Sequence, residues 1–381
     1  MKNLLIVISI FLCCACEKSW YHEYTISNDT DYEVTIYAYD TNVEPVFNSD
    51  VIKIKMTLWF CTQWRIINLQ VKKIMNLLDF SNYFPSEESC IEHFKAQREK
   101  LGIICKKCNN TTHFWKKDKI AFQCKKCGYR TALRSGTALE KSHLPYLYWY
   151  KAILMLSATR KTFSANEIQN QLRHEIYEPI WNMLHKIRTV MGKRDSRYKL
   201  TEFIEIDEGF FETINTDNQK DKKLKRGRGS QKQAKVLVLI ESMPVIEKSQ
   251  KDKHKPDRMP GHIKMIVMSD LKANSINEQV KATVDPETVI VSDGYNGYNK
   301  LKLMVKQHNV INTSELIEVH KVLPWVHSAI GNAKKILAGI HHSNGQGYLQ
   351  NYLNEYCYKY NRRYFGERIF DRLLIACIEN G

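Results

Sequence analysis

Four cysteines, arranged as two Cys-x-x-Cys units, have the spacing of a metal site. Cys105 and Cys108 form the first unit, Cys124 and Cys127 the second, and fifteen residues separate the two. Each unit can present two thiolates on one side of a tight turn, and two such turns complete a tetrahedral Zn²⁺ site. Gly128, just after the last cysteine, suits a left-handed backbone. We expect a structural zinc ribbon; the alternative is a pair of disulfides in an exported domain.

Two aspartates farther along the chain end apolar runs of strand character. Asp207 closes the run 203–207, and Asp293 closes the run 288–293. A carboxylate at the end of a buried strand is held rigidly, and two of them on adjacent strands can bind two Mg²⁺ ions about 4 Å apart. Such an ion pair activates water or a 3′-hydroxyl for attack on a phosphodiester. The alternative is that each aspartate only begins a turn.

The elements that must position these aspartates follow the order of a ribonuclease-H-like fold. The pattern predicts strands at 203–207, 235–240, 262–268, 288–293 and 316–319, and helices at 275–284, 325–338 and 347–363. Three strands followed by a helix, a strand and further helices form a mixed sheet with helices on both faces. We therefore predict an α/β protein with a ribonuclease-H-like catalytic domain at 199–381.

The predicted catalytic domain follows three smaller parts. Residues 75–100 form an N-terminal helical segment, and 101–131 form the ribbon. Residues 132–198 are helical, with a capping box at Ser164 and Glu167. The last helix of this segment carries basic residues, so the segment is either a helix-turn-helix DNA-binding unit or a plain helical packing module.

The first 74 residues have a different character. Residues 1–16 combine a positive start, a short apolar run and an Ala15-Cys16 pair, and they resemble a bacterial lipoprotein signal. Residues 1–50 carry no lysine after Lys18, and 51–74 have no clear period. We interpret 1–50 as a lipoprotein-like leader left by a gene fusion and 51–74 as the junction. A membrane-anchored lipoprotein is the less favoured alternative, and translation from Met1 or from Met75 stays open.

The charge favours a polyanionic partner. The formal net charge is +16 and the pI is near 9.2, which suits nucleic acid or an anionic membrane surface. A basic loop at 219–232 and another at 248–258 could follow a phosphate backbone, although a charge run is usually a solvated loop. The residues expected to contact DNA are Lys225, Arg226, Arg228, Arg362 and Arg363.

Several further segments carry a family resemblance. They are the ribbon, 133–137, 206–211, 225–230, 261–266, 325–334, 348–356 and 361–363. In this order they resemble bacterial insertion-sequence transposases of the DDE class that have an amino-terminal zinc ribbon. The resemblance covers residues 75–381, about four fifths of the chain, and does not include 1–74.

The resemblance implies a DNA transposase that binds terminal inverted repeats and catalyses metal-dependent cleavage and strand transfer. Asp207 and Asp293 take the first two ligand positions for catalytic Mg²⁺, which Mn²⁺ replaces. The third position is usually a glutamate, and 325–340 contains none. His327 and Asn332 are the candidates, and Lys334, seven residues after His327 on the same helical face, would contact the phosphate near the scissile bond.

The implied partners are double-stranded DNA, as terminal repeat and as target, and a second copy of the chain in a dimer or larger complex. No small-molecule substrate is expected, and the expected location is the cytoplasm, at the nucleoid. The runner-up interpretation is a catalytically inactive DNA-binding remnant, which the missing glutamate favours. The sequence leaves open the repeat and target sequences and whether the donor is excised or copied.

Overall fold

The chain forms two compact units in a computed structural model. The structure describes residues 21–26, 34–39, 76–159, 161–214, 233–245, 256–311, 323–341, 345–365 and 368–379. The units are Met1–Asn68 and Leu69–Gly381. In the first, β1 (Tyr21–Ile26) and β2 (Val34–Tyr39) form an antiparallel hairpin. The lipoprotein-like signal at 1–16 and the junction at 51–74 lie outside the described residues. Among the helices that are described, none is long and apolar enough to cross a membrane.

A helical module begins the second unit. It contains α1 (Leu77–Tyr83), α2 (Glu87–Leu101), α3 (Tyr146–Ala158), α4 (Ala165–Leu172) and α5 (Tyr177–Asp195). The predicted capping box starts α4: Glu167 N–H donates to Ser164 Oγ at 3.1 Å, and Ser164 N–H donates to Glu167 Oε2 at 2.7 Å. The core of the module is rich in aromatic rings, which include Phe94, Trp149 and Tyr150.

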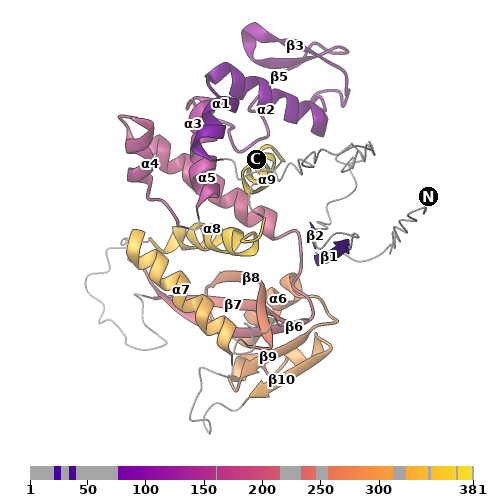
Figure 1. Cartoon of the computed structure of the whole chain (residues 1–381), viewed down its shortest axis with the longest axis vertical. Helices are drawn as coiled ribbons and strands as arrows, with labels where there is room; N and C mark the ends of the chain where they lie inside the picture. The colour runs from indigo at the N-terminus through magenta and orange to yellow at the C-terminus, as the bar shows by residue number, and fades with distance from the viewer. Residues whose placement is uncertain are drawn as a thin grey trace, which may run out of the picture. The chain divides into compact units, whose positions relative to one another are not determined.

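The last helix of the chain belongs to this module. Helix α9 (Arg368–Glu379) packs against α2, α3 and α5, and its Phe370 and Leu374 share a core cluster with Trp149 (Figure 1). The Ala138 N–H also donates to the Cys377 carbonyl at 2.8 Å. Helix α9 thus packs with the helical module, although the sequence placed it at the C-terminal end of the predicted domain 199–381. The apolar face of α9 matches helices that lie far away in sequence, and period alone does not reveal that match.

Helix α5 is a packing element. It lies against α3, α4, α8 and α9, and its Arg188 is 1% exposed and donates through Nε to Glu355 Oε2 at 2.8 Å. A recognition helix needs its basic face free for the DNA groove. The buried position of Arg188 favours the alternative interpretation, a plain helical packing module.

The ribbon is a three-stranded antiparallel sheet in the order β3-β4-β5. Its strands are β3 (His113–Lys116), β4 (Ala121–Cys124) and β5 (Arg130–Ala132). The rings of Trp115 and Phe122 lie 4.8 Å apart between centroids, and Phe122 is buried. Ile120 adopts a left-handed backbone (φ 44°) at the turn into β4. These few apolar contacts make a small core, as expected for a domain stapled by a metal.

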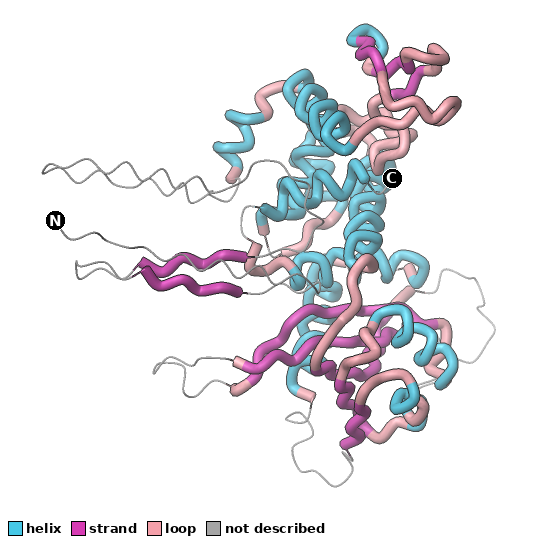
Figure 2. The backbone as a smooth tube through the Cα atoms, turned by 90° about the vertical axis from the view of Figure 1, so that its right-hand side faces the viewer, coloured by secondary structure: helices cyan, strands magenta, loops and turns pink. Residues whose placement is uncertain are grey.

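The second part of the unit is a five-stranded mixed sheet in the order β10-β9-β6-β7-β8. The strands are β6 (Phe203–Glu212), β7 (Gln233–Pro244), β8 (Arg258–Met268), β9 (Val289–Asp293) and β10 (Gln307–Ile311). Strands β6, β7 and β8 pair antiparallel, while β9 pairs parallel with both β6 and β10. Figure 2 shows this sheet and the helical module in separate regions of the chain.

Helices cover both faces of the sheet. Val236 and Val238 of β7 face α7 (Pro324–Ile340) and α8 (Leu349–Asn361). Leu237 and Leu239 face α6 (Ala273–Thr283) in a separate cluster. This alternation follows from the two-residue period of a strand that is buried on both sides. The predicted ribonuclease-H-like α/β fold is confirmed.

Strand β10 is absent from the sequence prediction. The segment 307–311 alternates weakly between partly buried and exposed positions because it forms the edge of the sheet. Weak alternation of this kind gives little sequence signal. The strand expected at 316–319 lies outside the described residues.

Candidate active site and metal centre

Asp207 and Asp293 lie where two parallel strands separate. Strands β6 and β9 pair from Phe203 and Val289 to Glu205 and Val291. The two aspartates come two residues later on each strand, so they follow the same register just past the last paired positions. Asp207 does not end its strand as predicted, because β6 continues to Glu212 along β7. Asp293 is the last residue of β9.

Each aspartate is oriented by a backbone N–H. Asp207 Oδ1 accepts from the Glu208 N–H at 2.8 Å, and Asp293 Oδ1 accepts from the Tyr295 N–H at 3.0 Å. The second oxygen of Asp207, Oδ2, lies 3.6 Å from His327 Nδ1. In Asp207, one carboxylate oxygen is thus held by the main chain, while the other faces His327 of α7.

Electrostatics at Asp207 favour a cation. Burial raises the pKa of Asp207, and the negative charge of Asp293 raises it further, while the Glu208 N–H and His327 act in the opposite direction. Beneath them, Tyr298 is fully buried, and its pKa is raised well above the ordinary value by burial and by the charges of Glu208, Asp207 and Asp293. Negative groups gathered in a desolvated setting are stabilised when a divalent ion neutralises them.

Helix α7 brings His327 and not Asn332 to the aspartates. His327 is partly buried beside Asp207, whereas Asn332 is exposed and lies about 140° around the helix from it. Lys334 is exposed and lies on the His327 face, with its Nζ 5.8 Å from the centroid of the Phe211 ring. The structure therefore assembles Asp207 with His327 and leaves Asn332 turned away.

The four cysteines converge in the ribbon. Their Sγ atoms all lie within 4.8 Å of one another. Two pairs, Cys105 with Cys127 and Cys108 with Cys124, have Sγ atoms 3.5 Å apart. A tetrahedral Zn²⁺ with bonds of about 2.3 Å places its sulfurs about 3.8 Å apart, so this arrangement fits the ion. Among the described residues, these four cysteines form the one group of three or more acidic, histidine or cysteine side chains whose ligand atoms lie this close together.

Local turns preorganise the cysteines. The Asn109 N–H donates to the Cys105 carbonyl at 2.9 Å, and the Gly128 N–H donates to the Cys124 carbonyl at 3.0 Å. Both donors have a left-handed backbone, with φ 54° at Asn109 and 72° at Gly128, as the sequence predicts for Gly128. Although burial acts to raise it, the Cys127 N–H and the Asn110 side chain lower the pKa of Cys124 to about 6. A lowered pKa favours the thiolate that a metal requires.

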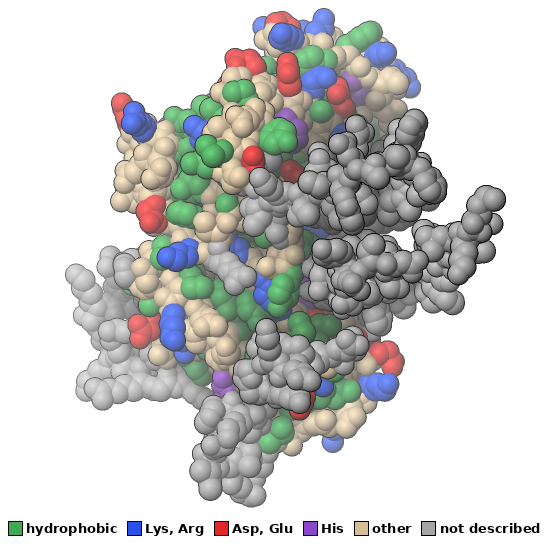
Figure 3. All heavy atoms as spheres, in the orientation of Figure 1, with side chains coloured by type: hydrophobic (Ala, Val, Ile, Leu, Met, Phe, Trp, Pro, Cys, Tyr) green, Lys and Arg blue, Asp and Glu red, His purple; other side chains and the backbone are tan. Residues whose placement is uncertain are grey.

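The lysines between the cysteines are exposed. Lys106, Lys107, Lys125 and Lys126 all face solvent at the two turns. Lys125 Nζ lies 4.8 Å from the centroid of the exposed Phe114 ring. Lys and Arg side chains are visible over the ribbon in the space-filling view (Figure 3). This end of the module therefore offers a compact set of cations.

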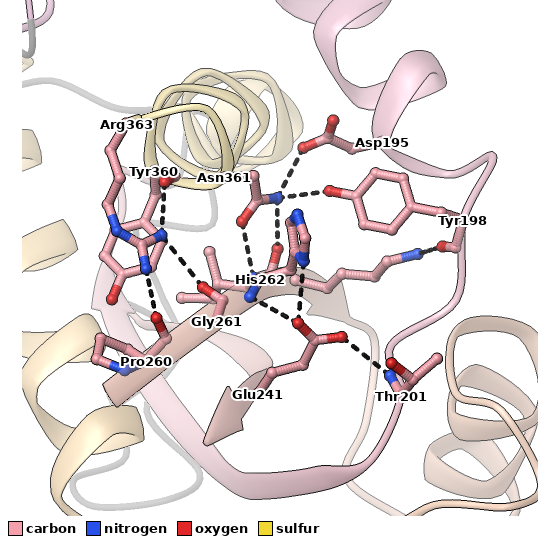
Figure 4. Close-up of polar contacts among 12 residues, drawn as sticks. Asp195, Tyr198, Thr201, Glu241, Pro260, Gly261, His262, Tyr360, Asn361 and Arg363 are labelled. Atoms are coloured by element: carbon pink, nitrogen blue, oxygen red, sulfur yellow. Dashed lines mark hydrogen bonds and ion pairs between the residues drawn. The ribbon is translucent and has the colours of Figure 1, made fainter. Parts of the chain in front are cut away.

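Two of the predicted DNA contacts are structural residues. Arg362 is 7% exposed and its Nη1 lies 2.7 Å from Asp195 Oδ1. Arg363 donates to the carbonyls of Pro260, Gly261 and Tyr360 (Figure 4). Their guanidinium groups hold the end of α8 to its surroundings, so we reassign them from DNA binding to packing. Lys225, Arg226 and Arg228 lie outside the described residues.

Two interior polar residues join the elements around the site, and the sequence analysis did not predict this role for them. Asn361 exchanges hydrogen bonds with the backbone of Ile263 and donates to Asp195 and Tyr198, which joins α8, β8 and the end of α5 (Figure 4). Glu205, two residues before Asp207, is 3% exposed and accepts from the first turn of α7. The available signal for Glu205 was a charged residue inside an otherwise apolar strand, which requires a partner.

The order and direction of the five strands define a ribonuclease-H-like domain. Residues 199–361 match the family described as ISXO2-like transposase domain, and this part of the chain belongs to that family. Residues 199–361 therefore form a transposase domain of the insertion-sequence type.

Other comparisons add little. No curated protein matches the chain. A solved structure described as a pre-cleavage Mos1 transpososome matches with a TM-score of 0.19 and 8% identity, over 58% of this chain and 75% of that one. A likeness this low carries no weight here, and the assignment depends on the sheet order and the family match.

Proposed function

We propose that the chain binds the terminal inverted repeats of its element and catalyses metal-dependent DNA cleavage and strand transfer. The observation that carries this proposal is the placement of Asp207 and Asp293 where β6 and β9 separate, with His327 3.6 Å from Asp207, inside a transposase domain. Hard oxygen donors fixed by backbone N–H groups suit Mg²⁺, and the imidazole also suits Mn²⁺.

The residues that would hold the catalytic ions are Asp207 and Asp293, with His327 as the third ligand. A bound Mg²⁺ pair would supply activation of the attacking oxygen and stabilisation of the leaving oxygen. His327 is neutral when it ligates, so affinity for the ions would depend more heavily on the two aspartates and on the DNA phosphates. Asn332 is the weaker candidate because it is exposed on another face of α7.

The protein side chains would position two in-line displacements. Water attacks first at the end of the element, and the freed 3′-hydroxyl then attacks the target strand. Lys334, on the His327 face of α7 and exposed, would bind the phosphate beside the scissile bond. The chain needs no nucleophilic side chain for either step, which agrees with a site made of carboxylates, an imidazole and an ammonium group.

The ribbon would bind DNA. Four exposed lysines at the two Cys-x-x-Cys turns can contact phosphates, and a Zn²⁺ held by Cys105, Cys108, Cys124 and Cys127 would fix their positions. Joining two element ends also requires at least two copies of the chain, and we expect the complex to act at the nucleoid. The basic loop with Lys225, Arg226 and Arg228 would add further contacts.

A second candidate function is DNA binding without catalysis. The absence of a glutamate from α7 favours it, because a neutral third ligand weakens metal binding. The two candidates differ only in cleavage.

The test uses protein that begins at Met75 and a labelled duplex that carries one element end. Cleavage is measured under single-turnover conditions with Mg²⁺, and binding is measured by gel shift. We expect wild type to cleave and Asp293→Asn to bind without cleaving. The control is Asp285→Asn, which makes the same change in the turn before β9 begins, where Asp285 Oδ1 accepts from the Glu287 N–H at 3.0 Å. Binding without cleavage by wild type would establish the inactive remnant instead.

A further inference from the structure

A buried carboxylate joins the strand of Asp207 to the helix of His327. Glu205 Oε2 accepts from the Trp325 N–H at 2.9 Å and from the Val326 N–H at 3.0 Å. Glu205 is 3% exposed and Val326 is fully buried. Hydrogen bonds from two N–H groups to one ionised oxygen in the interior are strong, and losing them leaves buried donors unsatisfied.

The N-cap residue of helix α7 does not supply these contacts. Its N-cap is Leu323, which makes no side-chain cap, and Pro324 follows as the first helical residue. The first N–H groups of a helix lack partners within the helix and carry partial positive charge. Glu205 therefore acts as the N-cap from another element, on the strand that also carries Asp207.

The contact is the first of a series along β6. Alternate residues on one face of β6 meet positions farther and farther along α7: Glu205 meets Trp325 and Val326, and Asp207 meets His327.

The series continues beyond Asp207. A Cβ at Gly209 would lie 2.8 Å from Phe211 Cε2 and 3.4 Å from Ile330 Cγ2, so Gly209 lies against Ile330 of α7. Phe211 lies below Lys334. A shift of α7 by one residue would break this series at its start.

We propose that Glu205 is a positioning residue that sets the register of α7 against β6, so that His327 and Lys334 face Asp207. Its effect on cleavage rests on the whole proposed function, whereas its effect on metal affinity rests only on the metal site proposed there. Glu205 itself lies behind the aspartates and makes no contact with DNA or metal in this role.

The chain provides a matched control in the helical module. There, Glu87 accepts from the Tyr146 N–H at 2.7 Å and the Leu147 N–H at 2.8 Å, at the start of α3. Helix α3 also lacks a side chain of its own at the cap, since its N-cap is Pro145. Glu87→Gln thus weakens the same kind of cap at a place without catalytic aspartates.

The experiment compares wild type, Glu205→Gln, Glu205→Ala and Glu87→Gln, all beginning at Met75. Amide exchange of the first turn of α7, Mn²⁺ affinity by electron paramagnetic resonance, and single-turnover cleavage are measured on each. We expect faster exchange at Trp325 and Val326, at least threefold weaker Mn²⁺ binding, and cleavage that is about 10-fold to 100-fold slower in the Glu205 variants. Glu87→Gln should match wild type in Mn²⁺ affinity and cleavage.

The outcomes separate the two proposals. Unchanged Mn²⁺ affinity and cleavage in both Glu205 variants would overturn the positioning role, even if exchange increases, because Glu205 would then only stabilise the fold. If Glu205→Ala does not fold, Glu205→Gln decides, because it keeps the shape of the side chain. If wild type does not cleave, the proposed function fails and the Mn²⁺ affinities alone decide on Glu205.

Discussion

The two candidate metal sites of this chain are built in opposite ways. The cysteine site takes its four ligands from two short turns within one small domain, and each turn is closed by its own backbone hydrogen bonds. The carboxylate site takes its residues from β6, β9 and α7, which become neighbours only when the sheet forms. The residues of the cysteine site are thus close together in the sequence, whereas those of the carboxylate site are far apart in the sequence.

This difference predicts that either site can be lost while the other stays intact. Loss of the zinc site should unfold the ribbon and leave the sheet intact, because the ribbon core is small and depends on its metal. Loss of a residue at the carboxylate site should stop chemistry and leave the ribbon and its DNA contacts intact.

Removal of zinc should have the largest effect. Cys124→Ser takes one of four ligands, and structural Zn²⁺ contributes on the order of 10 kcal/mol to folding. We expect loss of bound zinc, protease sensitivity confined to about residues 101–132, and loss of end binding. The reference is Cys90→Ser, which replaces a buried cysteine of α2 outside the cluster and should keep its zinc. A ribbon that stays protected without zinc would contradict the account.

Replacement of His327, the proposed third ligand, should have the next largest effect. His327→Ala removes the imidazole 3.6 Å from Asp207, and we expect cleavage to slow by about 100-fold, or near 3 kcal/mol. Asn332→Ala alters an exposed residue of the same helix and should stay within about twofold of wild type. Single-turnover cleavage on both variants, with end binding as the control, measures this. The reverse order of effects would assign the third position to Asn332.

The ion pair between α5 and α8 should give stability that depends on pH. Burial acts to raise the pKa of Glu355, but the cations of Lys359 and Arg188 outweigh it and lower the pKa to about 2, from an ordinary 4.5. A lowered folded-state pKa gives stability that is present above pH 4.5 and is lost as the pH falls towards 2.

Glu355→Gln should therefore cost about 3 kcal/mol at pH 7 and flatten the dependence of unfolding free energy on pH below 4.5. Urea unfolding at a series of pH values measures both quantities. Glu99→Gln, in the exposed pair with Lys95, is the control and should cost less than about 1 kcal/mol. Equal losses of unfolding free energy at the two sites would show that the buried α5–α8 pair stabilises the fold no more than the exposed pair does.

Single cations of the ribbon should have the smallest effect. Lys126→Gln removes one exposed charge beside Cys127, and the salt dependence of end binding should fall by about 0.9 in the logarithmic slope for one lost phosphate contact. Lys281→Gln, on α6 at the other face of the sheet, is the matched control and should leave the slope unchanged. An unaltered slope for Lys126→Gln would move the DNA contact away from this turn.

The same contrast explains what the sequence could predict. Cysteine spacing identified the ribbon because its ligands are local, and strand period placed Asp207 and Asp293 on one sheet. Tertiary pairing decided the rest. Arg362 resembles a DNA contact in the sequence, but in the structure it pairs with Asp195. Hydrophobic period alone could not assign α9 to the helical module. Glu205 gained its meaning only from the first turn of α7.

The most direct test of the central claim is transposition in cells. The element with its flanking ends is supplied on a donor plasmid, with coding from Met75, beside an Asp293→Asn version expressed at the same level. The account predicts that wild type moves the element to a target and that Asp293→Asn does not, while both bind the ends. Equal movement by the two would contradict a carboxylate site at Asp293, and no movement by wild type that still binds its ends would leave the chain a DNA-binding protein.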